Sequence, residues 1–185
     1  PLGPFRALHK IMPEHPEARG ELELVLAGDV PAEQREMIEA LGLSGVVRML
    51  GNLPHDEVPG LNRSADLLLA MNYDGWATLI PAKIYEYWAV GGAPILLLSC
   101  AGAATEFVER HRLGVSVDPH DVDGICRAIL DIFHRSSTGM PLRVSRMGIE
   151  AYDRQALTEI LGEVLAGVCQ GSTEGLHTSV PRTGA

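Results

Sequence analysis

One short segment of the 185-residue sequence combines groups that could hold a nucleotide. Lys83 and Glu86 are three residues apart, a spacing that places both on one face of a helix. Pro81 fits the first turn of that helix, because the N–H group that proline lacks is not needed there. Leu79 and Ile80 then carry backbone N–H groups close to the helix N-terminus, where phosphate binds readily. The Glu86 carboxylate can accept hydrogen bonds from vicinal hydroxyls such as those of a ribose.

The same spacing also has a plainer interpretation. A Lys–Glu pair on an exposed helix face is common and contributes only a few tenths of a kcal/mol to stability. Spacing alone favours this plainer interpretation over a nucleotide site.

Other motifs with known chemistry are absent from the sequence. No GxGxxG or GxxxxGK[ST] follows a strand-like segment, which argues against a dinucleotide site and a P-loop. No GxSxG elbow is present, and no base lies near Cys100, which we interpret as part of a small-residue turn. The seven histidines form no HxxxH pair and the three cysteines no CxxC pair, so we expect no metal site and no cofactor. No catalytic residue can be assigned from these patterns.

Composition limits the partners of the chain. Lys and Arg total 15 against 24 Asp and Glu, a formal net charge of -9, and no basic cluster is present. This balance argues against nucleic acid or an anionic membrane as a partner, although backbone N–H groups can still hold one small anion such as a nucleotide. No apolar run approaches the roughly 20 residues that span a bilayer, and from the first residues we expect no signal peptide. We therefore expect a cytoplasmic protein with reduced thiols.

The elements that position these groups alternate along the chain. Strand-like apolar segments are followed by segments with helical periodicity and short connections. The strands are expected at residues 21–27, 46–50, 66–71, 94–99 and 115–117, and the helices at 5–13, 32–41, 55–64, 81–90, 103–112, 122–134 and 151–169. Strands that are apolar on both faces predict an α/β fold, a doubly wound parallel sheet with helices on both faces. Ligands of such sheets lie outside the carboxyl ends of the strands.

Domain organisation follows from the same pattern. Residues 1–169 are expected to form one Rossmann-like domain. Residues 170–185 are rich in Gly, Ser, Thr and Pro with little to bury, and we expect them to be a disordered tail. Asp118 and Asp121 precede the helix expected from Val122 and are expected to cap it. Tyr85 and Trp88 recur at helical spacing, which favours packing over stacking on a base or sugar.

The order of elements and the segment PAKIYEYWAVGGAPIL at residues 81–96 resemble a known family. They are similar to the carboxyl-terminal, donor-binding domain of GT-B-fold retaining glycosyltransferases, the glycosyltransferase group 1 family. Four further segments match the family's pattern in the same order: LVLAGD at 24–29, VRMLGNL at 47–53, SADLLL at 64–69 and LGVSVDP at 113–119. The resemblance covers roughly residues 5–170.

The resemblance implies a role for particular residues. Glu86 stands where the family holds the ribose hydroxyls of the donor. Gly51, Asn52 and Leu53 stand where main-chain atoms contact the base. Thr78, Leu79, Ile80 and Pro81 stand where the loop meets the donor sugar and diphosphate. Lys83 either neutralises phosphate or only pins the helix.

The resemblance also implies an activity, a hexosyltransferase-like transfer of sugar from a nucleotide-sugar donor without a metal ion. The acceptor domain and the first strand of the donor-binding domain would precede Pro1, so this segment alone is expected to be inactive. The sequence departs from the family pattern at two places. Thr78 occupies the place of the family's first acidic residue, and the segment Gly91-Gly92-Ala93, between the helix and the following proline, is one residue longer than usual. Two other interpretations stay open, a sugar-nucleotide epimerase half and a non-catalytic nucleotide-binding or protein-interaction domain, and Thr78 favours the last.

Overall fold

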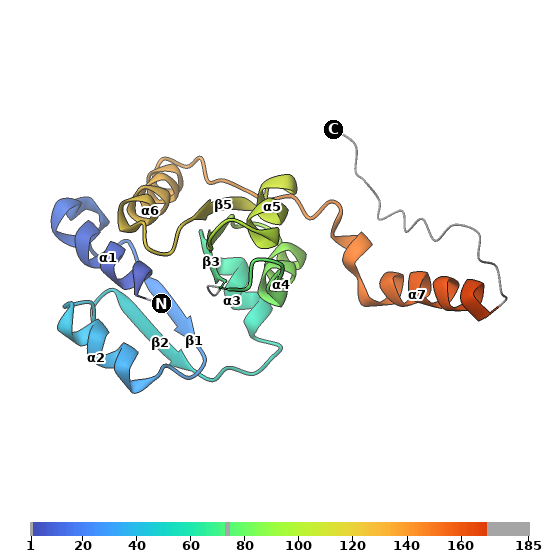
Figure 1. The fold of residues 1–185 in the computed structure, drawn as a ribbon. Coiled ribbons are helices and arrows are strands. Elements are labelled where there is room, and N and C mark those ends of the chain that lie inside the picture. Colours follow the sequence, from blue (N-terminus) through green and yellow to red (C-terminus); the bar gives the residue numbers. More distant parts are fainter. Residues whose placement is uncertain (1, 73–74, 170–185) are drawn as a thin grey trace. The chain divides into compact units, whose positions relative to one another are not determined.

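The computed structural model describes residues 2–72 and 75–169 (Figure 1). The chain divides into two compact units, Pro1–Arg146 and Met147–Ala185. The first unit alternates helices and short strands. Its elements are α1 (Gly3–Glu14), the 3-10 helix η1 (Pro16–Ala18), β1 (Leu24–Ala27), α2 (Ala32–Ala40), β2 (Val47–Gly51), α3 (Val58–Ser64), β3 (Leu68–Met71), α4 (Ala82–Val90), β4 (Ile95–Leu98), α5 (Ala103–Arg110), β5 (Gly114–Val117) and α6 (Val122–Ser137).

The second unit contains a short 3-10 helix, η2 (Ile149–Tyr152), and the helix α7 (Arg154–Cys169). Apolar side chains of α7 are about half exposed, at 48–55 % for Leu157, Ile160, Leu161 and Leu165. The tail expected at residues 170–185 lies outside the described residues. Among the residues that the structure does describe, every helix is too short or too polar to cross a lipid bilayer.

All strand pairs of the first unit are parallel, which confirms the expected α/β class. The strands form two sheets, β1-β2 and β3-β4-β5, where the sequence pattern predicted one. Within the described residues, the outer strands of the two sheets, β1 and β2 in one and β3 and β5 in the other, are each paired along one edge only. Local periodicity cannot foresee this division, because it depends on which strands pair.

Helix α1 joins the two sheets through its core contacts. Phe5 and Leu8 pack with Ile38, Leu43 and Val47 of the β1-β2 side. Ala7 and Ile11 pack with residues of β4 and α6 on the other side, namely Leu96, Leu98, Ile125 and Cys126. Burial on both faces of α1 follows from apolar residues at spacings of three and four. The four residues of β4 are each at most 1 % exposed, as expected for the central strand of a covered parallel sheet.

Several boundaries differ from the expected ones because local turns replace regular structure. β1 begins at Leu24 and not at Glu21, because the N–H groups of Glu21 and Leu22 both bond to the Ala18 carbonyl. α3 begins at Val58 and not at His55, because a turn closes from the Glu57 N–H to the Pro54 carbonyl. Of the two predicted caps of α6, Asp121 is confirmed: its Oδ1 accepts a hydrogen bond from the Gly124 N–H at 2.8 Å. Asp118 does not cap the helix, because its Oδ1 accepts the His120 N–H in the turn before α6, at 2.8 Å.

Candidate functional site

The amino end of α4 is the first component of the candidate site. Pro81 is the residue before the helix and offers no side-chain acceptor to cap it. Its carbonyl accepts the Ile84 N–H at 3.0 Å. The first N–H groups of a helix have no partner within the helix, and they carry the positive end of its dipole. The amides of Ala82 and Lys83 therefore mark a position that favours an anion.

The side chains of Lys83 and Glu86 form the second component. Lys83 Nζ lies 2.7 Å from Glu86 Oε2, and the two side chains are 48 % and 52 % exposed. Ile84 and Trp88 are buried, so Glu86 lies on the opposite, solvent-facing side of α4. The pair that the plainer interpretation expected is thus present. Such an exposed pair is worth about 0–1 kcal/mol, so a ligand can replace one partner of it at little cost.

The loop between β3 and α4 is anchored by a residue that the sequence analysis did not single out. Asn72 follows β3 and is only 9 % exposed. Its Nδ2 donates to the carbonyl oxygens of Trp76 and Leu79, at 3.2 and 3.4 Å. The Leu79 N–H, which the sequence predicts near a phosphate, donates to the Trp76 carbonyl at 3.0 Å within the loop. Thr78 is exposed, and Ile80 and Pro81 are half-buried.

A second anchor joins this loop to the start of α5. The Ala103 N–H donates to the Ala77 carbonyl at 2.7 Å. A Cβ atom on Gly102 would lie 2.4 Å from the same carbonyl oxygen, so a side chain at position 102 does not fit beside the loop. The run of small residues from Ala101 to Ala104 indicates a close contact in this region. It does not indicate which segment of the chain makes that contact.

The segment expected to contact the base lies at the end of β2. Gly51 has a positive φ of 67° and its carbonyl accepts the Gly28 N–H at 2.7 Å, so the loops after β1 and β2 are tied together. Asn52 is exposed and Leu53 half-buried. The described contacts join the loop at residues 76–81 to Asn72 and to the start of α5, whereas the described backbone bond of Gly51 runs to the loop after β1. The contact of Gly51, Asn52 and Leu53 with a donor stays a prediction.

The aromatic residues of α4 pack against the fold. Trp88 is 1 % exposed, and Tyr85 meets Phe107 edge-to-face at a ring separation of 5.0 Å, which confirms the expected packing role. The Tyr87 hydroxyl donates to the Leu69 carbonyl at 3.2 Å. Burial, with a smaller contribution from the Glu86 charge, raises the pKa of Tyr87 to about 12. Tyr87 therefore stays protonated at neutral pH and holds α4 to β3.

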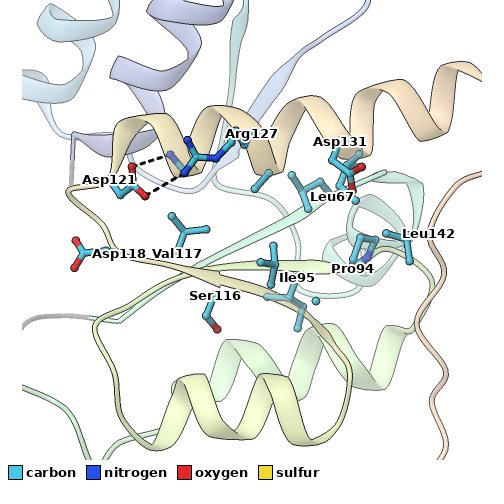
Figure 2. A pocket seen from close by; sticks show the side chains of 15 residues that line it. Leu67, Pro94, Ile95, Ser116, Val117, Asp118, Asp121, Arg127, Asp131 and Leu142 are labelled. Carbon is cyan, nitrogen blue, oxygen red and sulfur yellow. Dashed lines mark hydrogen bonds and ion pairs between the residues drawn. The ribbon is translucent and has the colours of Figure 1, made fainter.

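A cavity of about 580 Å³ lies elsewhere in the first unit, along β5 and α6 (Figure 2). None of the residues expected to contact a donor lines it. Its charged groups are the carboxylates of Asp118, Asp121 and Asp131 and the guanidinium of Arg127, which lies 3.6 Å from Asp121 Oδ2. This excess of negative charge disfavours a diphosphate in the cavity.

Comparison with known proteins identifies the family of this arrangement. The family model described as "Glycosyl transferases group 1" matches residues 5–135. The D-inositol 3-phosphate glycosyltransferase of Salinispora arenicola (strain CNS-205) is 26 % identical over 183 residues, which cover 92 % of this chain and 40 % of that protein.

Two solved structures share the fold at lower identity. Sucrose-phosphate synthase from Thermosynechococcus elongatus matches 90 % of this chain and 42 % of its own, with a TM-score of 0.67 and 20 % identity. The α,α-trehalose 6-phosphate synthase of Burkholderia multivorans matches 94 % of this chain and 41 % of its own, with a TM-score of 0.62 and 18 % identity. The chain thus spans about two fifths of the relatives that it matches, and its fold is that of one half of a GT-B glycosyltransferase.

Proposed function

Because the chain belongs to the glycosyl transferases group 1 family, we propose that it is the donor-binding half of an enzyme that transfers a sugar from a nucleotide-sugar donor to an acceptor. The observation that carries the proposal is the juxtaposition on α4. An uncapped helix start, suited to the diphosphate, lies about one turn from the exposed carboxylate of Glu86, suited to the ribose hydroxyls.

The contacts suggest how the donor is held. The ribose hydroxyls donate to Glu86, which releases Lys83 from its surface pair. The Lys83 ammonium then lies within reach of the diphosphate, next to the first amides of α4. Asn72 and Gly102 hold the loop from Trp76 to Pro81 in place, so that this binding surface is formed before the donor arrives.

Transfer itself needs stabilisation of the departing nucleoside diphosphate. In the proposed enzyme the N–H groups at the start of α4 and the Lys83 ammonium stabilise the negative charge of the departing diphosphate, without a metal ion in the reaction. Thr78 lies where the family has a carboxylate beside the donor sugar. Its hydroxyl can donate or accept one hydrogen bond but carries no charge, so sugar recognition at this position is expected to be weaker than with a carboxylate.

The acceptor is expected on a second half of the protein. This chain spans about 40 % of its relatives, and the resemblance to the family implies that transfer takes place in a cleft between two such halves. The present chain by itself is therefore expected to bind a donor and not to transfer sugar.

Calorimetric titration of the chain with UDP, GDP and their sugar derivatives tests the proposal. We expect one of these nucleotides to bind, and Glu86→Gln to weaken it by about 10- to 150-fold, the equivalent of about 1.5–3 kcal/mol for a hydrogen bond to a charged group. The matched control is Asp131→Asn, which removes the carboxylate of another exposed helical ion pair, Arg135–Asp131, outside the proposed site. This control is expected to bind as the parent chain does.

The alternatives give different results. Nucleotide binding that is unchanged by Glu86→Gln contradicts the proposed donor site and favours a different nucleotide-binding role, such as that of an epimerase half. Absence of binding by every nucleotide, in a chain shown to be folded by circular dichroism, favours a protein-interaction domain. Thr78 in place of the family's acidic residue is the observation that supports this second candidate.

A further inference from the structure

Three side chains with metal-binding chemistry meet at one end of the first unit, away from the loops discussed above. One ligand atom from each of His15, Glu17 and His134 lies within 4.8 Å of the other two. His15 Nδ1 is 3.0 Å from Glu17 Oε1. The rings of His15 and His134 meet edge-to-face with their centroids 6.4 Å apart. His15 is half-buried, whereas Glu17 and His134 are exposed.

The backbone beneath the first two ligands is fixed by short-range bonds. The His15 N–H closes α1 by donating to the Ile11 carbonyl at 2.8 Å, and the His15 carbonyl accepts the Ala18 N–H at 3.0 Å. Pro16 follows His15 and begins η1, which removes further backbone freedom. His15 and Glu17 are therefore presented from one rigid turn.

The third ligand comes from α6, which packs directly against α1 (Figure 1). Ala7 and Ile11 share a buried cluster with Ile125 and Cys126. Lys10 Nζ and Asp123 Oδ1 are joined at 2.7 Å on the surface of the same interface. This packing sets the distance between the end of α1 and the backbone of His134. The three residues are therefore brought together by the packing of the two helices.

The charges around the cluster suit a cation. Glu17 brings one carboxylate to the cluster, with its Oε1 3.0 Å from His15 Nδ1. Arg135, next to His134 in sequence, is paired with Asp131 at 2.9 Å, so its positive charge is compensated. The chain as a whole carries a formal charge of -9.

We propose that His15, Glu17 and His134 form a surface site for a divalent transition metal of the zinc type, which clips the end of α1 to α6. Two imidazole nitrogens and one carboxylate oxygen are a ligand set that zinc uses, with water in the fourth position. Zinc–ligand bonds of about 2.0–2.2 Å place neighbouring ligand atoms about 3.3 Å apart. The ligand atoms must therefore approach by up to about 1.5 Å, which rotation of the two exposed side chains can supply.

The location assigns this site a structural role. His15 and Glu17 lie just before β1, at its amino end. Helix α6 starts after the carboxyl end of β5 and runs away from it, so His134, near the end of α6, lies toward the opposite edge of the sheet. The cluster thus lies at the amino ends of the strands, whereas the proposed donor site lies at their carboxyl ends. The metal would stabilise the fold and take no part in sugar transfer. The metal site and the donor site can therefore be tested independently.

The experiment titrates the metal-free chain with Zn²⁺ by calorimetry and with Co²⁺ by visible absorption. We expect one ion per chain, a four-coordinate Co²⁺ spectrum, and a rise in Tm of roughly 5–10 °C when free Zn²⁺ is about 100-fold above Kd. His134→Ala and Glu17→Gln change exposed side chains, so both variants should fold, lose affinity by at least about tenfold and lose the Tm rise. His55→Ala, at an exposed histidine of the loop before α3, is the matched control and should keep both.

Two results would overturn the inference. One is a metal-free chain that takes up no Zn²⁺ or Co²⁺ at millimolar concentration. The other is a metal affinity that is the same in His134→Ala and Glu17→Gln as in the control His55→Ala. The ion would then be bound elsewhere. Circular dichroism of each metal-free variant separates loss of the site from loss of the fold.

Discussion

Replacing Gly102 by alanine tests whether the loop between β3 and α4 is held in place by the start of α5. The new Cβ atom would lie 2.4 Å from the Ala77 carbonyl oxygen, about 0.6 Å inside the 3.0 Å below which such contacts essentially do not occur. Two more backbone atoms of Ala77 lie at 3.1 Å. Because these are backbone atoms, the clash cannot be relieved by a side-chain rotation, and the loop from Trp76 to Pro81 must move.

The expected cost follows from this displacement. The loop loses the 2.7 Å hydrogen bond from the Ala103 N–H to the Ala77 carbonyl, worth about 0.5–1.5 kcal/mol. Overpacking of a close backbone contact adds about 1–3 kcal/mol. We therefore expect the free energy of unfolding to fall by about 2–4 kcal/mol and Tm by roughly 5–15 °C. Nucleotide affinity should fall as well, because the displaced loop leads directly into α4.

Thermal and urea denaturation measure the stability, and amide hydrogen exchange of Ala103 reports on the specific bond. The control is Gly60→Ala in α3, where an added Cβ meets no atom within 4 Å. Alanine in a helix is favoured over glycine by about 0.5–1 kcal/mol, so this control should be as stable as the parent or slightly more so. A Gly102→Ala chain with unchanged Tm and unchanged exchange at Ala103 would refute the proposed anchoring.

Three further substitutions or conditions have definite expected outcomes. Asp121→Ala removes the cap that accepts the Gly124 N–H, and the free energy of unfolding in urea should fall by about 0.5–2 kcal/mol; an unchanged value would show that the cap contributes nothing. Trp88→Ala empties a site that is 1 % exposed and should cost about 3–5 kcal/mol in the same measurement, whereas a loss below 1 kcal/mol would contradict the described core. The pKa of Tyr87 is raised to about 12 in the folded chain and is near 10 when unfolded, so its contribution to stability is present below pH 10 and is lost as the pH rises toward 12. Stability measured across this range should fall less steeply in Tyr87→Phe than in the parent, and equal slopes would exclude the contribution.

The elements of the fold were largely accessible from sequence because burial leaves a local pattern. The run of apolar residues in β4 and the spacing of apolar residues in α1 each match their observed burial. The division into two sheets was not accessible in this way. The pairing of strands is decided by contacts between segments that are distant in the chain. No sequence pattern in β1 indicates which of its two edges pairs with β2 in the described structure.

The candidate site shows the same contrast at the level of single residues. The ion pair of Lys83 and Glu86 depends on a spacing of three within one helix, and it was both predicted and observed. The spacing did not predict that the Leu79 N–H donates to the Trp76 carbonyl in a turn within the loop, and its contact with a phosphate stays a prediction. Gly102 was missed as an anchor because its importance depends on Ala77, which lies on another loop. The roles of Glu86 and of residues 51–53 toward a donor remain predictions.

The sequence by itself determined the parallel α/β class, the order of elements and the family, because hydrophobic periodicity and short ordered motifs are properties of neighbouring residues. Tertiary structure alone decided which atoms meet. It placed His134 beside His15 and Glu17, and it set Ala77 against Gly102. The physical reason is that distances between residues far apart in the chain are set by the packing of helices on sheets, and no local pattern records them.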